Sequence, residues 1–341
     1  MANHTSRKRK VRGRKITADR EQKEGRKSKK ELARKTSNAG ERDGDSPLSD
    51  PETVVPEPFV ETDAVESLQG RITGWLEADQ PVHLIGPTGS GKTALALSAA
   101  AERGRPVVWL NGDEAIDTAA LVGAHAGGER YEENDQFVSG VSKKTEIVRE
   151  RWVDNPLSVA VREGATLVYN EFSRSDPAAH NVLLSVFEEG VLERPGKRGE
   201  DRTIDVHPEF RAILTSNDVE YAGVHEQQDA LLDRFIGVHI DYYDEETERQ
   251  IVAAHVDLSE DAVDTVVATT RALRDELEIV VGTRAAITAA KGLTVFDGHT
   301  DDGEFDDETL SNVFTDVLAP KVAGDDEDDV DELRSKITEA I

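Results

Sequence analysis

The chain has 341 residues, enough for one or two domains with a substantial core, and a formal net charge of −28 at pH 7. It contains no cysteine, which excludes disulfide bonds and metal sites built from thiolates. No apolar run approaches the ~18 residues that a membrane-spanning helix needs, and the basic N-terminal segment lacks the apolar stretch of a signal peptide, so we expect a cytoplasmic protein that does not enter a membrane.

Charge is distributed unevenly along the chain. Residues 1–42 carry 16 Lys or Arg and 5 Asp or Glu, whereas the remaining 299 residues carry 25 and 64. A body this acidic repels itself in dilute buffer, but in molar salt the screening length falls to roughly 3 Å and most of that cost disappears. Acidic residues in the body, at 241–248 and 257–261, favour a protein of a salt-accumulating archaeon over an ordinary protein with an acidic tail.

Residues 1–60 are expected to form a disordered basic extension, because they are polar and charged through Asp45 and then contain several prolines. Two basic clusters, 7–10 and 26–30, could bind an acidic protein surface or a nucleic acid. No aromatic residue precedes Phe59, which argues against base stacking, and high salt weakens phosphate contacts. Nucleic acid is therefore not the expected partner. The basic extension is at least as well suited to tether the chain to an acidic partner or to its own acidic body.

An α/β nucleotide-binding domain is expected over 61–243, beginning with a helix whose apolar spacing runs from Ala64 to Leu76. Short apolar runs then predict strands that alternate with helices, which is the pattern of a parallel sheet. The five expected strands cover 82–85, 106–110, 166–169, 210–215 and 237–240. Helices are expected at 92–103, 157–163, after Asp176-Pro177 and near 227–232, with an irregular stretch over Leu121–Asp154 and a hairpin over 191–206.

The first expected strand leads into Gly86-Pro87-Thr88-Gly89-Ser90-Gly91-Lys92-Thr93, and a helix follows. This is the G-x-x-x-x-G-K-[ST] phosphate-loop pattern, between the strand and the helix that it requires. Its glycines let backbone N–H groups point into one concavity, and the helix N-terminus adds its positive dipole end. All eight residues are expected to bind a nucleoside triphosphate, with Lys92 at the β- and γ-phosphates and Thr93 at Mg²⁺. The spacing and the flanks argue against the alternative, a chance glycine-rich turn.

The expected strand at 166–169 ends in Asn170 and Glu171. In phosphate-loop sites an aspartate at such a strand end holds Mg²⁺ through water, and the next glutamate polarises the attacking water. Glu171 fits the role of general base, although it could be an ordinary polar residue that ends a strand. Asn170 occupies the aspartate position. Its amide can accept a hydrogen bond from a metal-bound water but brings no negative charge, so we expect weaker metal binding and slower hydrolysis.

Two further polar residues beside expected strands are candidates for the nucleotide site. Asn217 ends the strand at 210–215 and could orient water beside the γ-phosphate, or it could simply form a turn. Arg234 precedes the strand at 237–240 and could reach the γ-phosphate of a neighbouring subunit, as arginine fingers do. The alternative for Arg234 is an ion pair with Asp233 or another local carboxylate.

From 244 onward the pattern is helical, which predicts a small α-helical lid over 244–322. Its helices are expected at 245–256, 259–277, 283–294 and 308–319, followed by an acidic tail over 323–341 with at most one short helix. Arg284 lies at a helix start in this lid and could sense the γ-phosphate of its own site. It could equally be a solvated helix residue.

Together these motifs resemble the AAA+ ATPases, and within them the MoxR-like group, over about residues 62–295. The order of the phosphate loop, the 170–171 strand end, Asn217, Leu231-Leu232-Asp233-Arg234-Phe235 and Arg284 carries this resemblance. A closer resemblance, to the GvpN family of gas vesicle proteins in its haloarchaeal type, is carried by four segments. These segments are Leu167–Phe172, Asn181–Gly190, His207–Asn217 and Glu220–His225.

The resemblance implies an AAA+ P-loop fold with a parallel five-stranded sheet and a lid, with ATP and Mg²⁺ as bound groups. It further implies an ATPase that assists gas vesicle assembly by acting on shell or accessory proteins, in the cytoplasm and at the vesicle. Members usually work as homo-oligomeric rings, and the hairpin and the irregular stretch match insertions that contact substrate or are passive loops. Members carry Asp where this chain has Asn170. A nucleotide-gated scaffold with little hydrolysis therefore stays open, as does a MoxR-type chaperone for another protein complex.

Overall fold

The computed structural model describes residues 46–135, 143–217, 229–277, 279–296, 305–322 and 327–341. The chain divides into two units, 1–46 and 47–341, and the elements below belong to the second unit. The basic clusters of the expected extension, the segment 220–225 of the resemblance and part of the expected helix at 227–232 lie outside the described residues. Within the described ranges, no helix is both long enough and apolar enough to cross a membrane.

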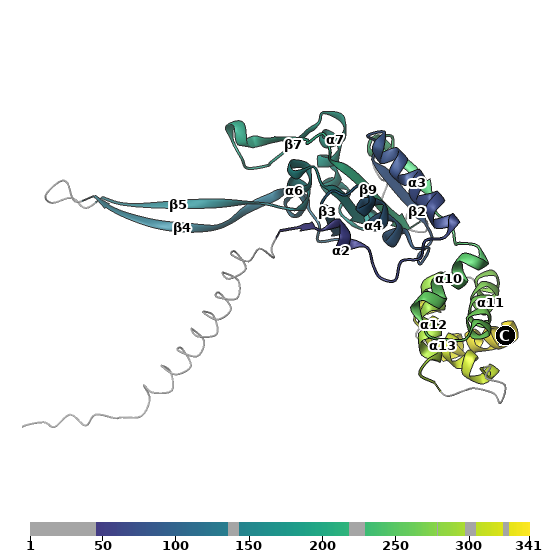
Figure 1. Cartoon of the computed structure of the whole chain (residues 1–341). Coiled ribbons are helices and arrows are strands. Elements are labelled where there is room, and N and C mark those ends of the chain that lie inside the picture. Colours follow the sequence, from purple (N-terminus) through teal and green to yellow (C-terminus); the bar gives the residue numbers. More distant parts are fainter. Residues whose placement is uncertain (1–45, 136–142, 218–228, 278, 297–304, 323–326) are drawn as a thin grey trace, which may run out of the picture. The chain divides into compact units, whose positions relative to one another are not determined.

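A six-stranded sheet, in the order β1-β3-β6-β9-β2-β10, forms the centre of the α/β part. Figure 1 labels its strands β2, β3 and β9. The five strands from β3 to β10 are parallel, and β1 pairs antiparallel with β3. The expected five-stranded parallel sheet is therefore confirmed, with one short edge strand added. The strands are β1 (Leu48–Ser49), β2 (Val82–Gly86), β3 (Val107–Asn111), β6 (Thr166–Asn170), β9 (Arg211–Asn217) and β10 (Ile236–His239).

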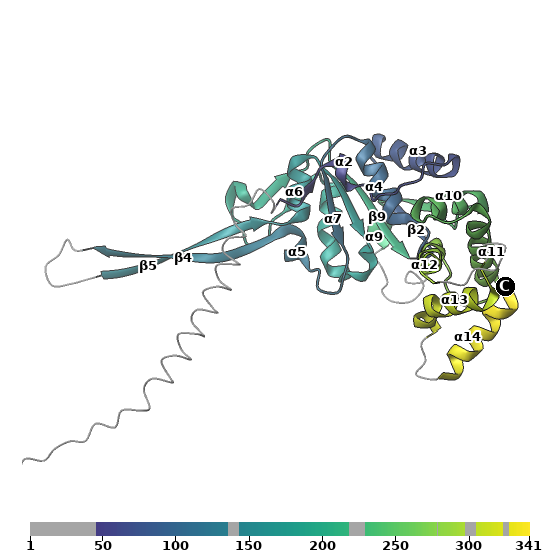
Figure 2. The ribbon, with the colours of Figure 1, turned by 60° about the horizontal axis from the view of Figure 1, so that its bottom comes forward.

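Successive residues of the central strands face opposite sides of the sheet, so each side has its own hydrophobic core. The helices that cover these cores are labelled in Figure 2. In β6, Val168 packs in one core, whereas Leu167 and Tyr169 pack in the other. The Val168 side is covered by α3 (Asp63–Glu77) and α4 (Lys92–Glu102). The opposite side is covered by α5 (Thr118–Val122), α6 (Pro156–Glu163), α7 (Asn181–Glu188) and α9 (Asp229–Leu232), with the 3-10 turns η2 (Phe172–Arg174) and η3 (Pro177–His180) beside them.

Residues 47–60 belong to the fold, so the expectation of disorder up to residue 60 is wrong for this segment. Strand β1 places Leu48 opposite Val108, and α2 (Pro51–Val54) begins after the capping residue Asp50. Proline at the first helical position and an aspartate cap are ordinary helix-start chemistry. The polar, proline-containing composition therefore marks a cap and turns here rather than a disordered chain.

The stretch between α5 and α6 is also more regular than expected, because β4 (Gly123–Asp135) and β5 (Lys143–Asp154) form a long antiparallel ribbon. Polar residues dominate both strands, so no apolar alternation marks them in the sequence. The expected hairpin over 191–206 is confirmed. It consists of β7 (Val191–Glu193), η4 (Gly199–Arg202) and β8 (Thr203–Asp205).

The helical lid has its own hydrophobic core, and it extends beyond residue 322. Its helices are α10 (Glu245–His255), α11 (Glu260–Glu276), α12 (Thr283–Leu293), α13 (Asp307–Val322) and α14 (Glu327–Ala340). Leu333 and Ile337 of α14 are buried in that core, one helical turn apart. The segment 327–340 is therefore part of the lid rather than the acidic tail that its composition indicates.

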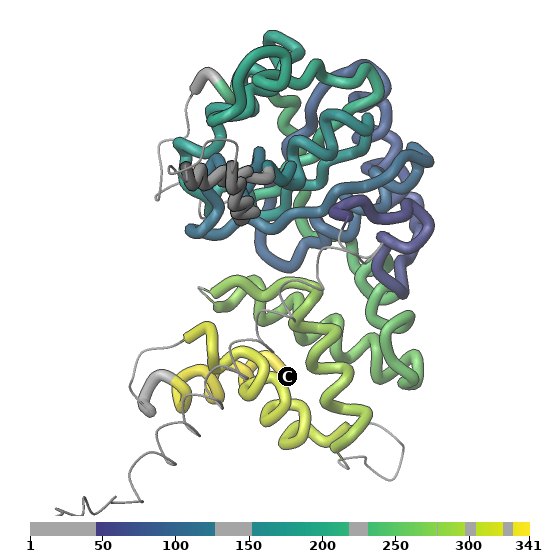
Figure 3. Tube along the Cα trace, turned by 90° about the vertical axis from the view of Figure 1, so that its left-hand side faces the viewer, coloured from purple at the N-terminus to yellow at the C-terminus, as the bar shows by residue number. Residues whose placement is uncertain are grey.

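The start of α12 closely approaches the phosphate loop. Figure 3 traces the backbone of both segments, which its colour bar identifies by residue number. A Cβ built on Gly282 would lie 2.6 Å from the carbonyl oxygen of Thr88 and 3.1 Å from the Cα of Gly89. Both neighbours are backbone atoms that a side-chain rotation cannot remove. Only glycine therefore permits this approach between the lid and the α/β domain.

Replacing Gly282 with alanine is expected to push α12 away from the phosphate loop and to lower the free energy of unfolding by about 1–3 kcal/mol. The matched control is Gly74→Ala in α3, where an added Cβ would meet no atom within 4 Å. That control should raise the free energy of unfolding by about 0.5–1 kcal/mol. Chemical denaturation in molar KCl measures both. Equal effects of the two substitutions would contradict the close approach.

Two buried histidines make the fold sensitive to acid. His83 of β2 lies 2.7 Å from the Ser216 hydroxyl through its Nε2, and His180 packs against the rings of Tyr169 and Phe172. Burial lowers the pKa of His83 to about 4, with a further lowering by His239, and burial lowers the pKa of His180 to about 4. Both rings are therefore neutral in the folded protein at neutral pH.

The unfolded chain takes up protons at these histidines below about pH 6.5, but the folded chain does so only near pH 4. Stability is therefore present above about pH 6.5 and is lost as the pH falls. We expect a loss of about 2 kcal/mol for each histidine between pH 7 and pH 5. Chemical denaturation of the parent and of His180→Phe across this range measures the free energy of unfolding at each pH. The variant should show about half of the parent's loss of stability per pH unit. If the free energy of unfolding of the variant depends on pH as that of the parent does, His180 does not cause the acid sensitivity.

Candidate nucleotide-binding site

The carboxyl ends of four neighbouring parallel strands bring the predicted site residues to one edge of the sheet. Gly86, which ends β2, is the register partner of Asn217 at the end of β9. Asn170, which ends β6, is the register partner of Asn111 at the end of β3. Ligands of open α/β sheets bind at this edge. The strand order therefore assembles a site from residues that are far apart in sequence.

The phosphate loop has the backbone that its sequence predicts. Gly89 and Gly91 both have φ of 84°, in the left-handed region that glycine adopts without strain. Lys92 is the first residue of α4 and is buried, and its Nζ donates to the carbonyl oxygens of Gly86 and Pro87, each at 2.8 Å. Within the described ranges, the buried Ser90 Oγ has no hydrogen-bond partner. A polar atom left open in this loop fits an anion-binding role.

An oxygen-rich cluster surrounds Asn170. The side chains of Thr93 and Thr215 both donate to Asn170 Oδ1, at 2.6 Å and 2.8 Å, and Asn170 Nδ2 donates to Asn111 Oδ1 at 2.8 Å. Hydroxyl and amide oxygens are ligands that Mg²⁺ accepts alongside phosphate oxygens and water. Thr93 and Asn170 together therefore fit a magnesium ion, although Asn170 contributes no negative charge.

Glu171 is held in an unusual conformation beside Asn217. Its φ is 53°, a left-handed value that is rare for a residue with a side chain, and its N–H donates to Thr215 Oγ1 at 3.0 Å. Asn217 Nδ2 donates to Glu171 Oε2 at 2.9 Å. Asn217 Oδ1 is buried, and no residue of the described chain bonds to it. The pair thus offers one carboxylate to accept a proton and one open amide oxygen to hold water.

A cavity of about 260 Å³ lies between the phosphate loop and the lid. Gly89, Gly91 and Arg284 line it, together with the segment 56–60. Burial raises the pKa of Tyr243, which also lines the cavity, to about 12, so its ring is a neutral wall. Arg284 and the phosphate loop therefore line one cavity, and the expected sensing of the γ-phosphate by Arg284 stays a prediction.

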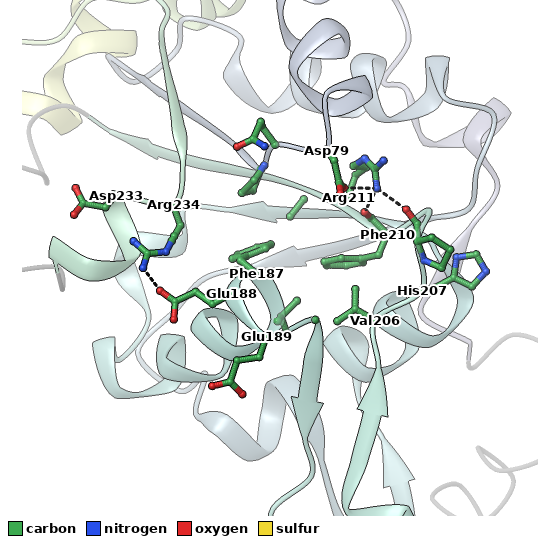
Figure 4. Close-up of a pocket in the computed structure, with 16 residues that line it drawn as sticks. Asp79, Phe187, Glu188, Glu189, Val206, His207, Phe210, Arg211, Asp233 and Arg234 are labelled. Atoms are coloured by element: carbon green, nitrogen blue, oxygen red, sulfur yellow. Dashed lines mark hydrogen bonds and ion pairs between the residues drawn. The ribbon is translucent and has the colours of Figure 1, made fainter.

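Arg234 lies at the opposite edge of the sheet. It pairs with Glu188 at a second cavity of about 520 Å³, and Figure 4 shows the two side chains pointing toward one another. Pro81 and Arg211, which line the same cavity, stand just before β2 and at the start of β9. Arg234 is thus separated from its own phosphate loop by the length of β2. Its expected action on a neighbouring subunit stays a prediction.

Several residues of this edge were not predicted from the sequence. Asn111 follows an apolar run at a strand end, which is the same signal that identified Asn170, so the pattern could have revealed it. Thr215 lies inside a strand, and its bonds to the 170–171 strand end depend on the strand order. Tyr243 and Gly282 meet the phosphate loop only after the chain has formed the lid, so no local signal marks them.

One protein family model matches the α/β part of the chain. The AAA domain family (dynein-related subfamily) matches residues 81–235, which run from the residue before β2 to the residue before β10. Among solved structures, a mutant of RuvB from Thermotoga maritima aligns with 16% identity and a TM-score of 0.48, over 76% of this chain and 71% of that one.

Relatives in sequence are much closer. Gas vesicle ATPase GvpN2 of Halobacterium salinarum is 56% identical, over 99% of this chain and 97% of its own length. Gas vesicle ATPase GvpN of Haloferax mediterranei is 53% identical over the same shares, and that of Ancylobacter aquaticus is 42% identical over 80% of each chain. With identity this high over nearly its whole length, and a phosphate loop beside a strand-end glutamate, the chain belongs to the gas vesicle ATPase family GvpN and is an AAA+ ATPase.

Proposed function

We propose that this ATPase hydrolyses Mg-ATP at Gly86–Thr93 with Glu171 as general base, and that turnover assists gas vesicle assembly by acting on shell or accessory proteins. The observation that carries the proposal is the 2.9 Å bond between Asn217 and Glu171, beside the Thr93–Asn170 pair. The names of the relatives support the gas vesicle role. The chain would then work in the cytoplasm and at the vesicle.

Each residue of the site has a separate task in this mechanism. The N–H groups of the phosphate loop and Lys92 bind the phosphates, and Thr93 and Asn170 would hold Mg²⁺, which supplies charge neutralisation. Asn217 fixes one carboxylate oxygen of Glu171 and can orient the attacking water through its own Oδ1. Glu171 then accepts a proton from that water as the water attacks the γ-phosphate. Arg284, at the edge of the cavity, would sense the γ-phosphate.

A homo-oligomeric ring gives Arg234 a function. The residue cannot serve its own phosphate loop, because the two lie at opposite edges of the sheet. Its side chain is about 40% exposed, and its carboxylate partner Glu188 is similarly exposed at 38%. An exposed ion pair contributes little stability, so Arg234 can leave Glu188 at small cost when a neighbour's phosphate is near. We therefore propose that Arg234 completes the site of the adjacent subunit.

The substitution Glu171→Gln removes the general base but keeps the size and the bond acceptor of the side chain. It should lower ATP turnover by at least about 100-fold while nucleotide binding persists, because general-base catalysis is worth that much. The measurements are phosphate release and binding of a fluorescent ATP analogue in molar KCl. Glu77→Gln, at the exposed end of α3, is the matched control and should behave as the parent. Parental turnover in Glu171→Gln would reject the assigned base.

A second candidate, a nucleotide-gated scaffold, is favoured by the neutral side chain of Asn170. If the site hydrolyses ATP competently as it stands, Asn170→Asp should change the turnover rate less than about tenfold. Phosphate release at several Mg²⁺ concentrations in molar KCl tests this. A much larger increase in rate would mean that ATP in the parent chain mainly stabilises one conformation, and it would support the scaffold instead.

A further inference from the structure

We propose that Glu248 is a positioning residue of the nucleotide site, acting through Arg274 and Tyr242 to hold the lid helix α12 against the phosphate loop. The inference rests on the proposed function, in which the phosphate loop binds ATP and Arg284 of α12 senses it. It concerns a buried carboxylate that makes no contact with the catalytic cluster around Glu171. Its role would be to make the lid respond to the state of the loop.

Glu248 lies in the first turn of α10, and its side chain is only 2% exposed. Four donors from two other helices surround its carboxylate. They are Arg271 Nη1 at 2.9 Å and Arg274 Nη1 at 3.3 Å on Oε2, and Arg274 Nη2 at 2.7 Å and Thr283 Oγ1 at 2.8 Å on Oε1. A buried carboxylate is tolerated only with such complete pairing, and its geometry is correspondingly rigid.

The two arginines extend this cluster into the segments that enter α10 and α12. Arg271 Nη1 also donates to the carbonyl oxygen of Tyr243, at 3.2 Å, just before α10. Arg274 Nε donates to the carbonyl oxygen of Val281, at 2.7 Å, two residues before α12. Glu248 itself accepts from Thr283, the neighbour of Arg284. The cluster therefore restrains the chain just before α10, just before α12 and at Thr283, the residue that precedes Arg284.

Tyr242 carries the connection from the cluster to the phosphate loop. The Arg274 guanidinium lies 4.0 Å from the centre of the Tyr242 ring, and the Tyr242 hydroxyl donates to the carbonyl oxygen of Thr88 at 3.3 Å. A Cβ on Gly282 would lie 3.1 Å from the same ring and 2.6 Å from the same oxygen. One unbroken set of contacts thus runs from Thr88 through Tyr242 and Arg274 to Glu248 and Thr283.

Such a set of contacts gives the loop and the lid a shared conformational equilibrium. Phosphate binding at Gly89 and Ser90 changes the loop backbone or restrains it, and Thr88 transmits that restraint to Tyr242. Because Arg274 contacts Tyr242 and Glu248 joins Arg274 to Thr283, the restraint reaches Arg284 without a contact between the ligand and Glu248. The competing explanation is that Glu248 only holds α10, α11 and α12 together within the lid.

The experiment measures ATP kinetics and the distance between the two domains in the same proteins. The native chain contains no cysteine, so Glu77→Cys in α3 and Lys291→Cys in α12 provide two exposed labelling sites in an otherwise unlabelled full-length chain. Distances between spin labels are recorded with and without a non-hydrolysable ATP analogue, in molar KCl. Two variants are made in this background, Tyr242→Leu, which leaves the Glu248 pairs intact, and Glu248→Gln.

Both variants should broaden the distance distribution in the nucleotide-bound state and raise the KM for ATP about tenfold, with a smaller change in kcat. Tyr242→Leu should do so with little change in the thermal midpoint, whereas Glu248→Gln should also lower that midpoint. Glu245→Gln, an exposed carboxylate on the same helix turn, should match the parent in every measurement. If Tyr242→Leu leaves the distances and KM unchanged, Glu248 merely stabilises the lid and the proposal is rejected.

Lys92→Ala separates this failure from a failure of the proposed function. Loss of binding of the fluorescent ATP analogue in Lys92→Ala supports the nucleotide site on which the inference rests. If Lys92→Ala binds that analogue as the parent does, the assigned nucleotide site is wrong. In that case the proposed function and this inference are both rejected, whatever the Tyr242→Leu variant shows.

Discussion

Parallel strands that end at one edge of a single sheet are the constraint on which the rest of this molecule depends. Because β2, β6 and β9 are parallel, the phosphate loop, Glu171 and Asn217 emerge on the same side. Each strand is buried on both faces, so its direction and register are fixed by two hydrophobic cores. The apolar packing of the strands therefore fixes the positions of the polar residues that follow them.

Local sequence patterns predicted those parts of the site that are formed by residues adjacent in the sequence. The phosphate loop needs particular residue types at fixed spacing, and an apolar run that ends in Asn170-Glu171 is recognisable as a strand end. The contact between Glu171 and Asn217 is different, because it requires β9 to lie between β6 and β2. The sequence indicates that such strands exist, but their order follows from how the helices pack.

Failures of prediction came from segments whose composition hides a tertiary role. Residues 47–60 contain several prolines and acidic residues, yet Leu48 and Ser49 pair with β3, and 327–340 are acidic yet bury Leu333 and Ile337 in the lid. No sequence signal marks Glu248 either, since an acidic residue in the first turn of a helix is normally a solvated partner of the dipole. Only the arrival of α11 and α12 turns it into a buried carboxylate.

The left-handed backbone at Glu171 sets stability against activity at this position. A side chain with φ near +53° costs on the order of 1–3 kcal/mol, which glycine would avoid. Selection for a more stable fold alone would therefore favour losing the carboxylate. Any search for thermostable forms of this protein has to protect residue 171, because a stabilising change to glycine there would remove the proposed general base.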